Sequence, residues 1–404
     1  MTPDPKSHGD GTALFAELAR VVAALAAQDG LRSFSLPYPR EAQRALDRAV
    51  LHCLDRGRTP PRSLPELLSW CREHPAGGPL FRVPAALVSP GATLIDPVGH
   101  MPTRTCLEVA SSGPEGRVEQ EAVRLLAELA AACGSVDAYE RCRRFLANRP
   151  AIGQRDRFAG REPWSTAVWN RVRHLYEAVP EALLHRRTLA LCGTCGLPAL
   201  AAREKPRASA ARGGPDPSAV RGAPDPSTGH RPGRWCESED CPPDVPFRLV
   251  RDPGHTLLLR RSLRVFLALP GPTEHAALAA LDRAGAGHEL IPAGLGMYRV
   301  TGAGPRVCFL RADDRREPAL LAARVAASPE ALDGPVLVVT PGPRAERDGY
   351  RAAFTAALRD TPVRAVLTTP EDLVRRARTL RVTPDAPDCP DAPNPPSGTE
   401  TDHA

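Results

Sequence analysis

The sequence contains no uninterrupted apolar run of about 18 residues, the length that a helix needs to cross a lipid bilayer. Residues 1–11 are polar and lack an apolar core segment, so no signal peptide is expected. The eleven cysteines are therefore expected in the reducing cytoplasm, where disulfides are uncommon. In that setting, clustered cysteines indicate a metal site and scattered cysteines indicate packing in a core.

Lysine is almost absent as well, because it occurs only at Lys6 and Lys205 and arginine supplies the other basic residues. This bias, together with abundant Ala, Gly and Pro, is typical of GC-rich bacterial coding sequences. The abundance of arginine alone therefore says little about partners. The net charge of +6 permits contact with nucleic acid without requiring it. A chain of 404 residues is long enough for two or three domains with hydrophobic cores.

Two segments at the ends of the chain differ sharply in pattern. Residues 1–185 carry apolar side chains at helical spacing and predict a mostly α-helical N-terminal domain. Within it, Ser63 ahead of Pro65 and Glu66 marks a helix start, and the apolar series from Trp164 through Tyr176 predicts a further helix. Residues 381–404 are dense in Pro and Asp and predict a disordered tail.

Four cysteines form the sharpest motif, in a segment predicted to resemble a zinc ribbon over residues 186–246. Cys192 and Cys195 form one close pair, and Cys236 and Cys241 form another, so together they can supply four thiolates to a structural Zn²⁺. The alternative is a redox Cys-x-x-Cys pair, which needs no second pair. Residues 203–234 between the pairs contain a Pro-Asp-Pro-Ser near-repeat and almost no large apolar residue, which predicts a disordered insertion.

Five further cysteines lie in or beside the predicted helical stripes and are interpreted as small buried apolar residues: Cys53, Cys71, Cys106, Cys133 and Cys142.

Residues 247–380 alternate between short strands and helices. The pattern predicts helices at 273–284, 317–327, 346–358 and 370–378, and strands at 288–291, 297–301, 306–310, 336–340 and 363–367. Helix, three strands, helix and strand is the core order of restriction-endonuclease-like domains. The predicted fold class is therefore multidomain: a mostly α N-terminal domain, a zinc-ribbon-like segment and an α/β restriction-endonuclease-like domain.

The chain resembles the restriction-endonuclease-related proteins of prokaryotic PIWI (pPIWI-RE) three-gene islands, with a helical domain, a cysteine-rich segment and an endonuclease domain in that order. The phrases that carry the resemblance are Tyr38-Pro39 with Gln43, Leu64–Leu68, Pro102-Thr103 with Cys106, Tyr176–Pro180, Pro270-Gly271 with Glu274, Tyr298, and Pro318 with Leu320–Ala322. The resemblance implies a PIWI-like protein and a DinG-type helicase as partners, and interference with invading plasmid or phage DNA.

The sequence departs from this family at the positions expected to hold metal. Endonucleases of this fold carry an acid on the second strand and Asp/Glu-x-Lys on the third, and the acids bind Mg²⁺. Here Arg299 and Arg311 stand at the two expected acid positions, and Asp313 stands where lysine is expected.

Three hypotheses follow. In the first, the protein is a non-catalytic subunit in which four residues offer positive charge to nucleic-acid phosphates: Arg299, Arg311, Arg315 and Arg316. In the second, it is an active Mg²⁺-dependent DNA endonuclease whose acids have moved to Glu274, Asp313 and Asp314. Those acids also fit a helix start and a solvated turn. In the third, it is a zinc-stabilised scaffold that does not contact nucleic acid.

Overall fold

The computed structural model describes residues 6–28, 31, 34, 36–113, 116–153, 166–201, 234–242, 244–292, 295–301, 308–328 and 333–382. The two segments predicted to be disordered lie almost wholly outside these ranges. Of residues 203–234 only Arg234 is described, and of residues 381–404 only the first two. No helix in the described ranges is long and apolar enough to cross a membrane.

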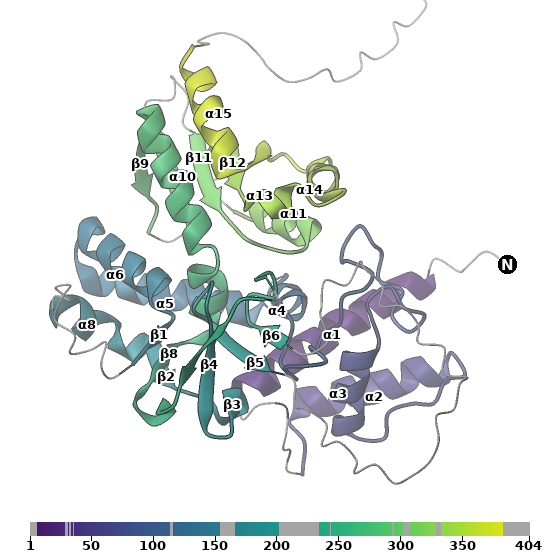
Figure 1. The fold of residues 1–404 in the computed structure, drawn as a ribbon. Helices are drawn as coiled ribbons and strands as arrows, with labels where there is room; N and C mark the ends of the chain where they lie inside the picture. Colours follow the sequence, from purple (N-terminus) through teal and green to yellow (C-terminus); the bar gives the residue numbers. More distant parts are fainter. Residues whose placement is uncertain are drawn as a thin grey trace, which may run out of the picture.

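Seven helices of the described chain precede the cysteine motif and form most of what we call the helical part (Figure 1). They are α1 (Lys6–Gln28), α2 (Arg40–Leu54), α3 (Leu64–Glu73), α4 (Arg104–Ala110), α5 (Arg117–Cys133), α6 (Val136–Asn148) and α8 (Thr166–Val172). The predicted start of α3 is confirmed, because the Ser63 side chain accepts a hydrogen bond from the amide of Glu66. Helices α1 to α4 enclose one apolar core, in which Phe15 packs edge-on against Phe81.

The helix predicted through Tyr176 ends earlier than expected. After α8 the chain makes the 3-10 turn η1 (Arg173–Leu175) and enters strand β2 (Tyr176–Ala178). Strand β2 pairs with β8 (Leu257–Leu259), which also pairs with β1 (Ala151–Ile152). This three-stranded sheet completes the helical part. Its middle strand, β8, comes from about eighty residues further along the chain than β2.

A second sheet carries the four cysteines, and we call it the cysteine sheet. Its strands are β3 (Leu184–His185), β4 (Thr188–Cys192), β5 (Pro198–Ala201), β6 (Arg234–Cys236) and β7 (Phe247–Val250), and β7 pairs with β4. Two strands of this sheet, β3 and β7, lie outside residues 186–246, the range predicted for the zinc-ribbon-like segment. Strand β3 already belongs to the cysteine sheet, and residues 247–259 belong to the first two sheets rather than to the C-terminal domain.

A short helical connector joins the cysteine sheet to the C-terminal part: after η3 (Pro253–His255) and β8 come α9 (Arg261–Leu263) and the π-helix η4 (Arg264–Ala268). The C-terminal part, which we call the α/β part, begins at α10 (Gly271–Ala284) and stands above the rest of the molecule in Figure 1.

The α/β part is built on a five-stranded sheet of order β13-β12-β11-β10-β9. The strands are β9 (Gly287–Leu290), β10 (Met297–Thr301), β11 (Cys308–Ala312), β12 (Val336–Val339) and β13 (Ala365–Thr368), and the helices after α10 are α11 (Pro318–Ala326), α13 (Gly342–Ala345), α14 (Tyr350–Leu358) and α15 (Pro370–Val382). Strands β11, β12 and β13 run parallel, whereas β10 is antiparallel to both of its neighbours. The purely apolar β12 is buried on both faces, as predicted for a central parallel strand.

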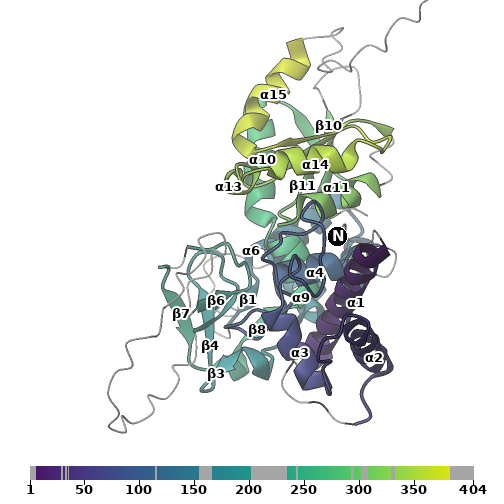
Figure 2. The same cartoon turned by 90° about the vertical axis from the view of Figure 1, so that its right-hand side faces the viewer.

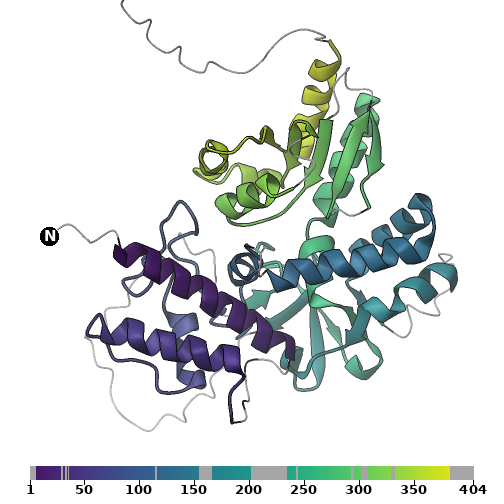
Figure 3. The same ribbon diagram turned by 180° about the vertical axis from the view of Figure 1, so that it is seen from behind.

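Each face of this sheet has its own core. On one face, Leu310 and Val300 pack with α10, α15 and, across the junction, with residues of α5 and α6 such as Leu146. On the other face, Phe309 packs with α11 and α14, including Phe354 (Figures 2 and 3). The α/β part is thus joined to the helical part through one face of its sheet.

The element order predicted for this part agrees with the structure, and most of the predicted bounds differ by a few residues from the observed ones. Strand β11 ends two residues later than predicted, and residues 302–307 before it lie outside the described residues. The helix predicted over 346–358 begins only at Tyr350, as α14, because Gly349 adopts a left-handed conformation with φ of 71° immediately before it; α13 lies ahead of the predicted range.

We expect Phe354→Ala to destabilise the protein by about 3–5 kcal/mol, because it removes a ring that is 1% exposed from the core between α11 and α14. Urea unfolding measures the effect. Val366→Ala on the edge strand β13, where the side chain is 42% exposed, is the control and should cost much less. Equal losses for the two variants would contradict this description of the core.

Candidate metal centre and interdomain ion-pair network

The four cysteines converge from two turns of the cysteine sheet. Cys192 ends β4, and the turn to β5 is closed by a hydrogen bond of 2.9 Å from the Gly196 amide to the Cys192 carbonyl. Gly196 has a φ of 71°, which favours glycine. Cys236 ends β6, and a hydrogen bond of 2.8 Å from the Glu239 amide to the Cys236 carbonyl closes the turn towards Cys241.

The sulfur geometry fits a tetrahedral metal ion. The four Sγ atoms lie within 4.8 Å of one another, and those of Cys195 and Cys236 are 3.5 Å apart. Zinc–sulfur bonds of about 2.3 Å at tetrahedral angles would place the sulfurs roughly 3.8 Å apart. Among the described residues this is the one group of three or more His, Cys, Asp or Glu ligand atoms that comes together in this way. The chain therefore holds a cysteine cluster that can bind a metal ion such as zinc.

The protonation of the thiols supports the same conclusion. Hydrogen bonds from Cys195 and Cys236 hold the pKa of the Cys241 thiol far below its usual value. The hydrogen bonds that Cys236 makes with Cys195 and Cys241 raise its own pKa, so one thiolate forms at the expense of its neighbours. Only a cation at the centre allows all four to ionise together. With four protein ligands, such a site has no open position for substrate, so its contribution is to folding.

The acids considered for a relocated nuclease site do not form a second metal centre. Glu274 on α10 is bound by both terminal nitrogens of Arg143 on α6, and it accepts a hydrogen bond of 2.6 Å from the Tyr298 hydroxyl. Asp314 pairs with Arg104 of α4 at 3.1 Å and with Arg344 at 3.0 Å.

Asp313 is likewise occupied by arginine. Its Oδ2 lies 2.6 Å from an Arg315 terminal nitrogen and 3.3 Å from the Arg311 Nε. Burial opposes its ionisation, but Arg315 and Arg311 outweigh burial and hold the pKa of Asp313 below its usual value. Each of the three acids is therefore paired with a guanidinium, and they contact different partners rather than a common centre.

The arginines predicted to bind phosphate are mostly buried in the same network. Arg311 and Arg315 are 2% and 4% exposed, and both are paired with Glu119 of α5, at 3.9 Å and 2.7 Å. Arg316 pairs with Glu239 of the cysteine sheet. Only Arg299 among the four predicted phosphate-binding arginines is exposed in this arrangement.

Strand register explains why Arg299 stands apart from the others. Met297 is the residue opposite Arg311, whereas Arg299 lies opposite Phe309, further along the strand. Arg299 and Arg311 are therefore diagonal neighbours on the two strands and do not face each other directly. Both side chains project from the same face of the sheet, but only the end of β11 is covered by the helical part.

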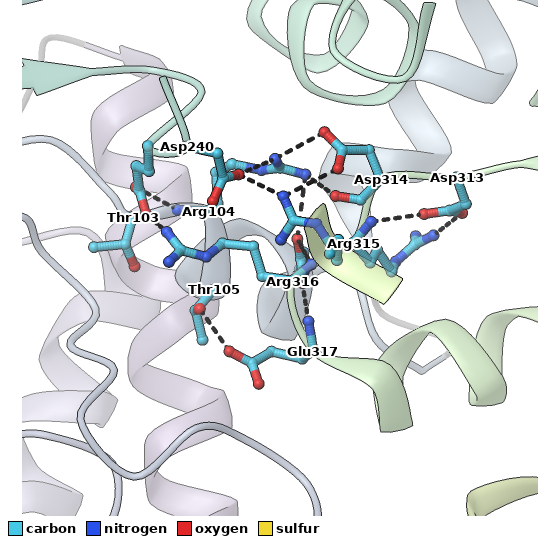
Figure 4. A network of polar contacts seen from close by, with 12 residues as sticks. Thr103, Arg104, Thr105, Asp240, Asp313, Asp314, Arg315, Arg316 and Glu317 are labelled. Atoms are coloured by element: carbon cyan, nitrogen blue, oxygen red, sulfur yellow. Dashed lines mark hydrogen bonds and ion pairs between the residues drawn. The ribbon is translucent and has the colours of Figure 1, made fainter. Parts of the chain in front are cut away.

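A reciprocal pair of glutamates joins α4 to the start of α11. The Glu108 carboxylate accepts hydrogen bonds from the amides of Arg316, at 2.8 and 3.0 Å, and Glu317, at 3.1 Å. In return, the Glu317 carboxylate accepts from the Thr105 hydroxyl at 2.9 Å and from the Ser89 amide at 2.9 Å (Figure 4). Glu108 thus caps a helix that begins about two hundred residues later, where the amides favour negative charge.

The helical part matches a known family. Residues 14–153 match the model of the pPIWI_RE three-gene island domain Y. Over these residues, about a third of its length, the chain is related to the pPIWI-RE proteins. Searches of curated proteins and of solved structures found no match. The matched residues include Arg104, Glu108, Glu119 and Arg143, so this pPIWI-RE domain Y supplies every helical-part side chain in the ion pairs described above.

Sequence reasoning missed these domain Y partners. All seven residues of α4 are buried, because its polar side chains Arg104, Thr105 and Glu108 face the α/β part rather than solvent, and the sequence does not reveal that burial. Glu119 and Arg315 are separated by 196 residues, and no spacing rule connects them. The one available signal was local: Thr103 precedes α4 and accepts a hydrogen bond from the Cys106 amide, as a helix-capping residue does.

The buried Glu108 should make stability fall as pH rises through the weakly acidic range. Burial raises the pKa of Glu108 to about 7, against the attraction of Arg104 and with repulsion from Glu317. The folded state therefore binds this proton more tightly than the unfolded chain. The resulting stability is present below the ordinary value of 4.5 and is lost as pH rises from there to about 7. The pKa values of Asp313 and Glu119 are lowered, so these groups change stability only at more acidic pH.

Glu108→Gln removes this titration while keeping an oxygen that accepts the amides of Arg316 and Glu317. Between pH 5 and pH 8 the wild type should lose up to roughly 3 kcal/mol of stability relative to the variant. Urea unfolding at several pH values measures the difference. Glu128→Gln, which removes an exposed acid paired with Arg124, is the control and should follow the wild type. Parallel curves for wild type and Glu108→Gln would refute the assignment.

Proposed function

We propose that this pPIWI-RE-related protein is a restriction-endonuclease-fold subunit of a PIWI-centred bacterial defence system that acts on invading plasmid or phage DNA, and that its own catalytic site is degenerate. The order α10-β9-β10-β11-α11-β12 supports the fold assignment, because it matches the core order of such domains. The assignment of a PIWI-like protein and a DinG-type helicase as partners, and of a cytoplasmic location, rests on the family resemblance.

The proposal that the catalytic site is degenerate rests on the residues at the end of strand β11. A metal-dependent nuclease needs carboxylates that are open to both a cation and a phosphate. Here Arg311 occupies an expected acid position, and Asp313 is bound by Arg311 and Arg315 beneath α5. The alternative of an active enzyme with relocated acids is disfavoured because Glu274, Asp313 and Asp314 are each neutralised by arginine.

The four-cysteine site has a structural role in this proposal, and zinc is the ion that its donor set favours. A redox Cys-x-x-Cys pair is disfavoured, because Cys236 and Cys241 complete a four-sulfur cluster with Cys192 and Cys195. A zinc scaffold without nucleic-acid contact remains the competing function, and DNA binding separates the two.

We expect one zinc ion per chain. Elemental analysis of the purified protein measures it, and Cys192→Ser should lose the metal and unfold at least the β4–β5 hairpin, because metal binding and folding are coupled. Cys53→Ser is the matched control: this thiol is buried in the helical part, so its replacement should leave the zinc content unchanged. A protein that is well folded and free of zinc would exclude the site.

We also expect the purified protein not to cleave DNA in Mg²⁺ or Mn²⁺ above background. A cation beside Arg311 would meet like charge within a few ångströms, which costs roughly 4 kcal/mol at an effective dielectric of about 20. Plasmid nicking and linear-duplex digestion measure the activity. The control for contamination is Asp313→Asn. Cleavage by the wild type that this substitution abolishes would establish an active nuclease with relocated acids instead.

A further inference from the structure

The turn between Cys236 and Cys241 carries three acids, and each of them binds arginines. Glu237 is 2% exposed and forms a two-point pair with Arg264 of the π-helix η4, at 2.7 and 3.0 Å. Glu239 accepts the Arg104 amide at 2.7 Å and also pairs with the Arg316 side chain. Asp240 pairs with Arg104 at 3.2 Å and with Arg344 (Figure 4). We call residues 237–240 the cysteine turn.

The cysteine turn is therefore a joint between three parts of the molecule. Through Glu237 it is fixed to the connector that leads into the α/β part. Through Glu239 and Asp240 it holds Arg104 of the helical part on one side, and Arg316 and Arg344 of the α/β part on the other. Among the described residues, no other short segment lies between two cysteines of the cluster and also forms ion pairs with both the helical part and the α/β part.

The conformation of this turn depends on the cysteines at its ends. Glu239 adopts a left-handed φ of 59°, which is unfavourable for a residue with a side chain. A metal ion that joins Cys236 and Cys241 closes the turn and holds Glu239 and Asp240 towards their arginines. The hydrogen bond that the Glu239 amide donates to the Cys236 carbonyl closes the same turn from within.

The two surfaces that the turn holds together have opposite charge. The edge of the α/β part carries five arginines against three acids: Arg311, Arg315, Arg316, Arg324 and Arg344 against Asp313, Asp314 and Glu317. Facing it are four acids and one arginine: Glu108, Glu119, Glu239, Asp240 and Arg104. The carboxylates thus occupy the positions at which phosphate oxygens would meet these arginines, since both groups suit guanidinium geometry.

We propose that the cysteine turn is a metal-dependent latch. With metal bound, it keeps the arginine-rich edge of the α/β part covered by carboxylates, and its release exposes that edge to a nucleic-acid backbone. The choice of nucleic acid as the ligand of the exposed edge rests on the proposed function, whereas the latch itself does not.

The connector provides a place for such an opening to occur. A π-helix is an uncommon turn geometry that occurs mainly at functional sites, and η4 lies directly before the start of α10. The α10 side of the α/β part is held separately by the buried Arg143–Glu274 pair. Release of the cysteine turn would therefore remove the ion pairs of Glu239 and Asp240 from the α11 and α13 side and weaken its attachment, which then rests on Glu108 and Glu119, while α10 stays attached.

The latch is tested by Glu239→Gln with Asp240→Asn, which removes the charges of the turn and keeps all four cysteines. Hydrogen exchange of the Arg316 and Glu317 amides reports the opening, because both amides donate to Glu108 only when the edge is covered. We expect their exchange to accelerate by about tenfold or more while β12 stays protected, as local opening without unfolding requires. The matched control is Glu128→Gln with Asp282→Asn, two exposed acids elsewhere.

Metal removal and DNA binding complete the test. Cys241→Ser should produce the same exchange pattern. If this variant unfolds, the variant with Glu239→Gln and Asp240→Asn still tests the latch.

A 20-base-pair duplex should bind the opened variant more tightly than the wild type, with a salt slope steeper by about 0.9 for each arginine released. Adding Arg316→Gln and Arg344→Gln should remove that gain. Unchanged exchange in the neutralised variant overturns the latch. Opening without tighter DNA binding overturns the nucleic-acid ligand and counts against the proposed function, while the latch stands.

Discussion

The arrangement of the whole molecule depends on how one buried cation, Arg104, is neutralised. Its side chain is 3% exposed, and a guanidinium cannot stay in such a place without carboxylates. The carboxylates come from Asp314 of the α/β part and Asp240 of the cysteine turn, so a single charge fixes the relative positions of three parts. Removing one partner of a buried pair typically costs about 3–5 kcal/mol, because the other charge is left uncompensated. The domain arrangement is therefore specified by electrostatics rather than by an apolar interface alone.

The local elements were predictable where one physical signal was strong. Helix α10 is followed by Gly285 in a left-handed conformation, which ends it, and β12 is an uninterrupted apolar run in which three of the four residues are valine. The burial of helix α4 was not predictable, because its polar side chains Arg104, Thr105 and Glu108 contact residues of the α/β part about two hundred positions further along the chain. Strand β8 was missed for a different reason: three leucines have no period, and only pairing with β1 and β2 makes them a strand.

The candidate site likewise contains residues that the sequence reveals and residues that it does not. The four cysteines could be found from sequence because thiolate chemistry is specific and each pair is close in the chain. The domain Y partners of Asp314 and Glu274 could not, since Arg104 lies 210 positions from Asp314 and Arg143 lies 131 positions from Glu274. The register between β10 and β11 was a second feature that could not be predicted. A shift of two residues decides whether Arg299 or Met297 faces Arg311, and neither side chain indicates which register forms.

Arg311, which stands at an expected acid position near the end of β11, balances the charge of nearby carboxylates in the folded chain. A divalent cation at this position would neutralise nearby carboxylates, and it would need water and an open approach. Here α5 covers the position, and Glu119 enters it beside Asp313. Arg311 and Arg315 supply the positive charge that these two carboxylates require, without any exchangeable ligand. The low dielectric even lowers the pKa of Arg311 to about 10, through burial and the neighbouring Arg324, but that value still leaves it protonated at neutral pH. Guanidinium groups therefore perform the charge-balancing part of a metal ion's role, and the polarising, catalytic part is absent.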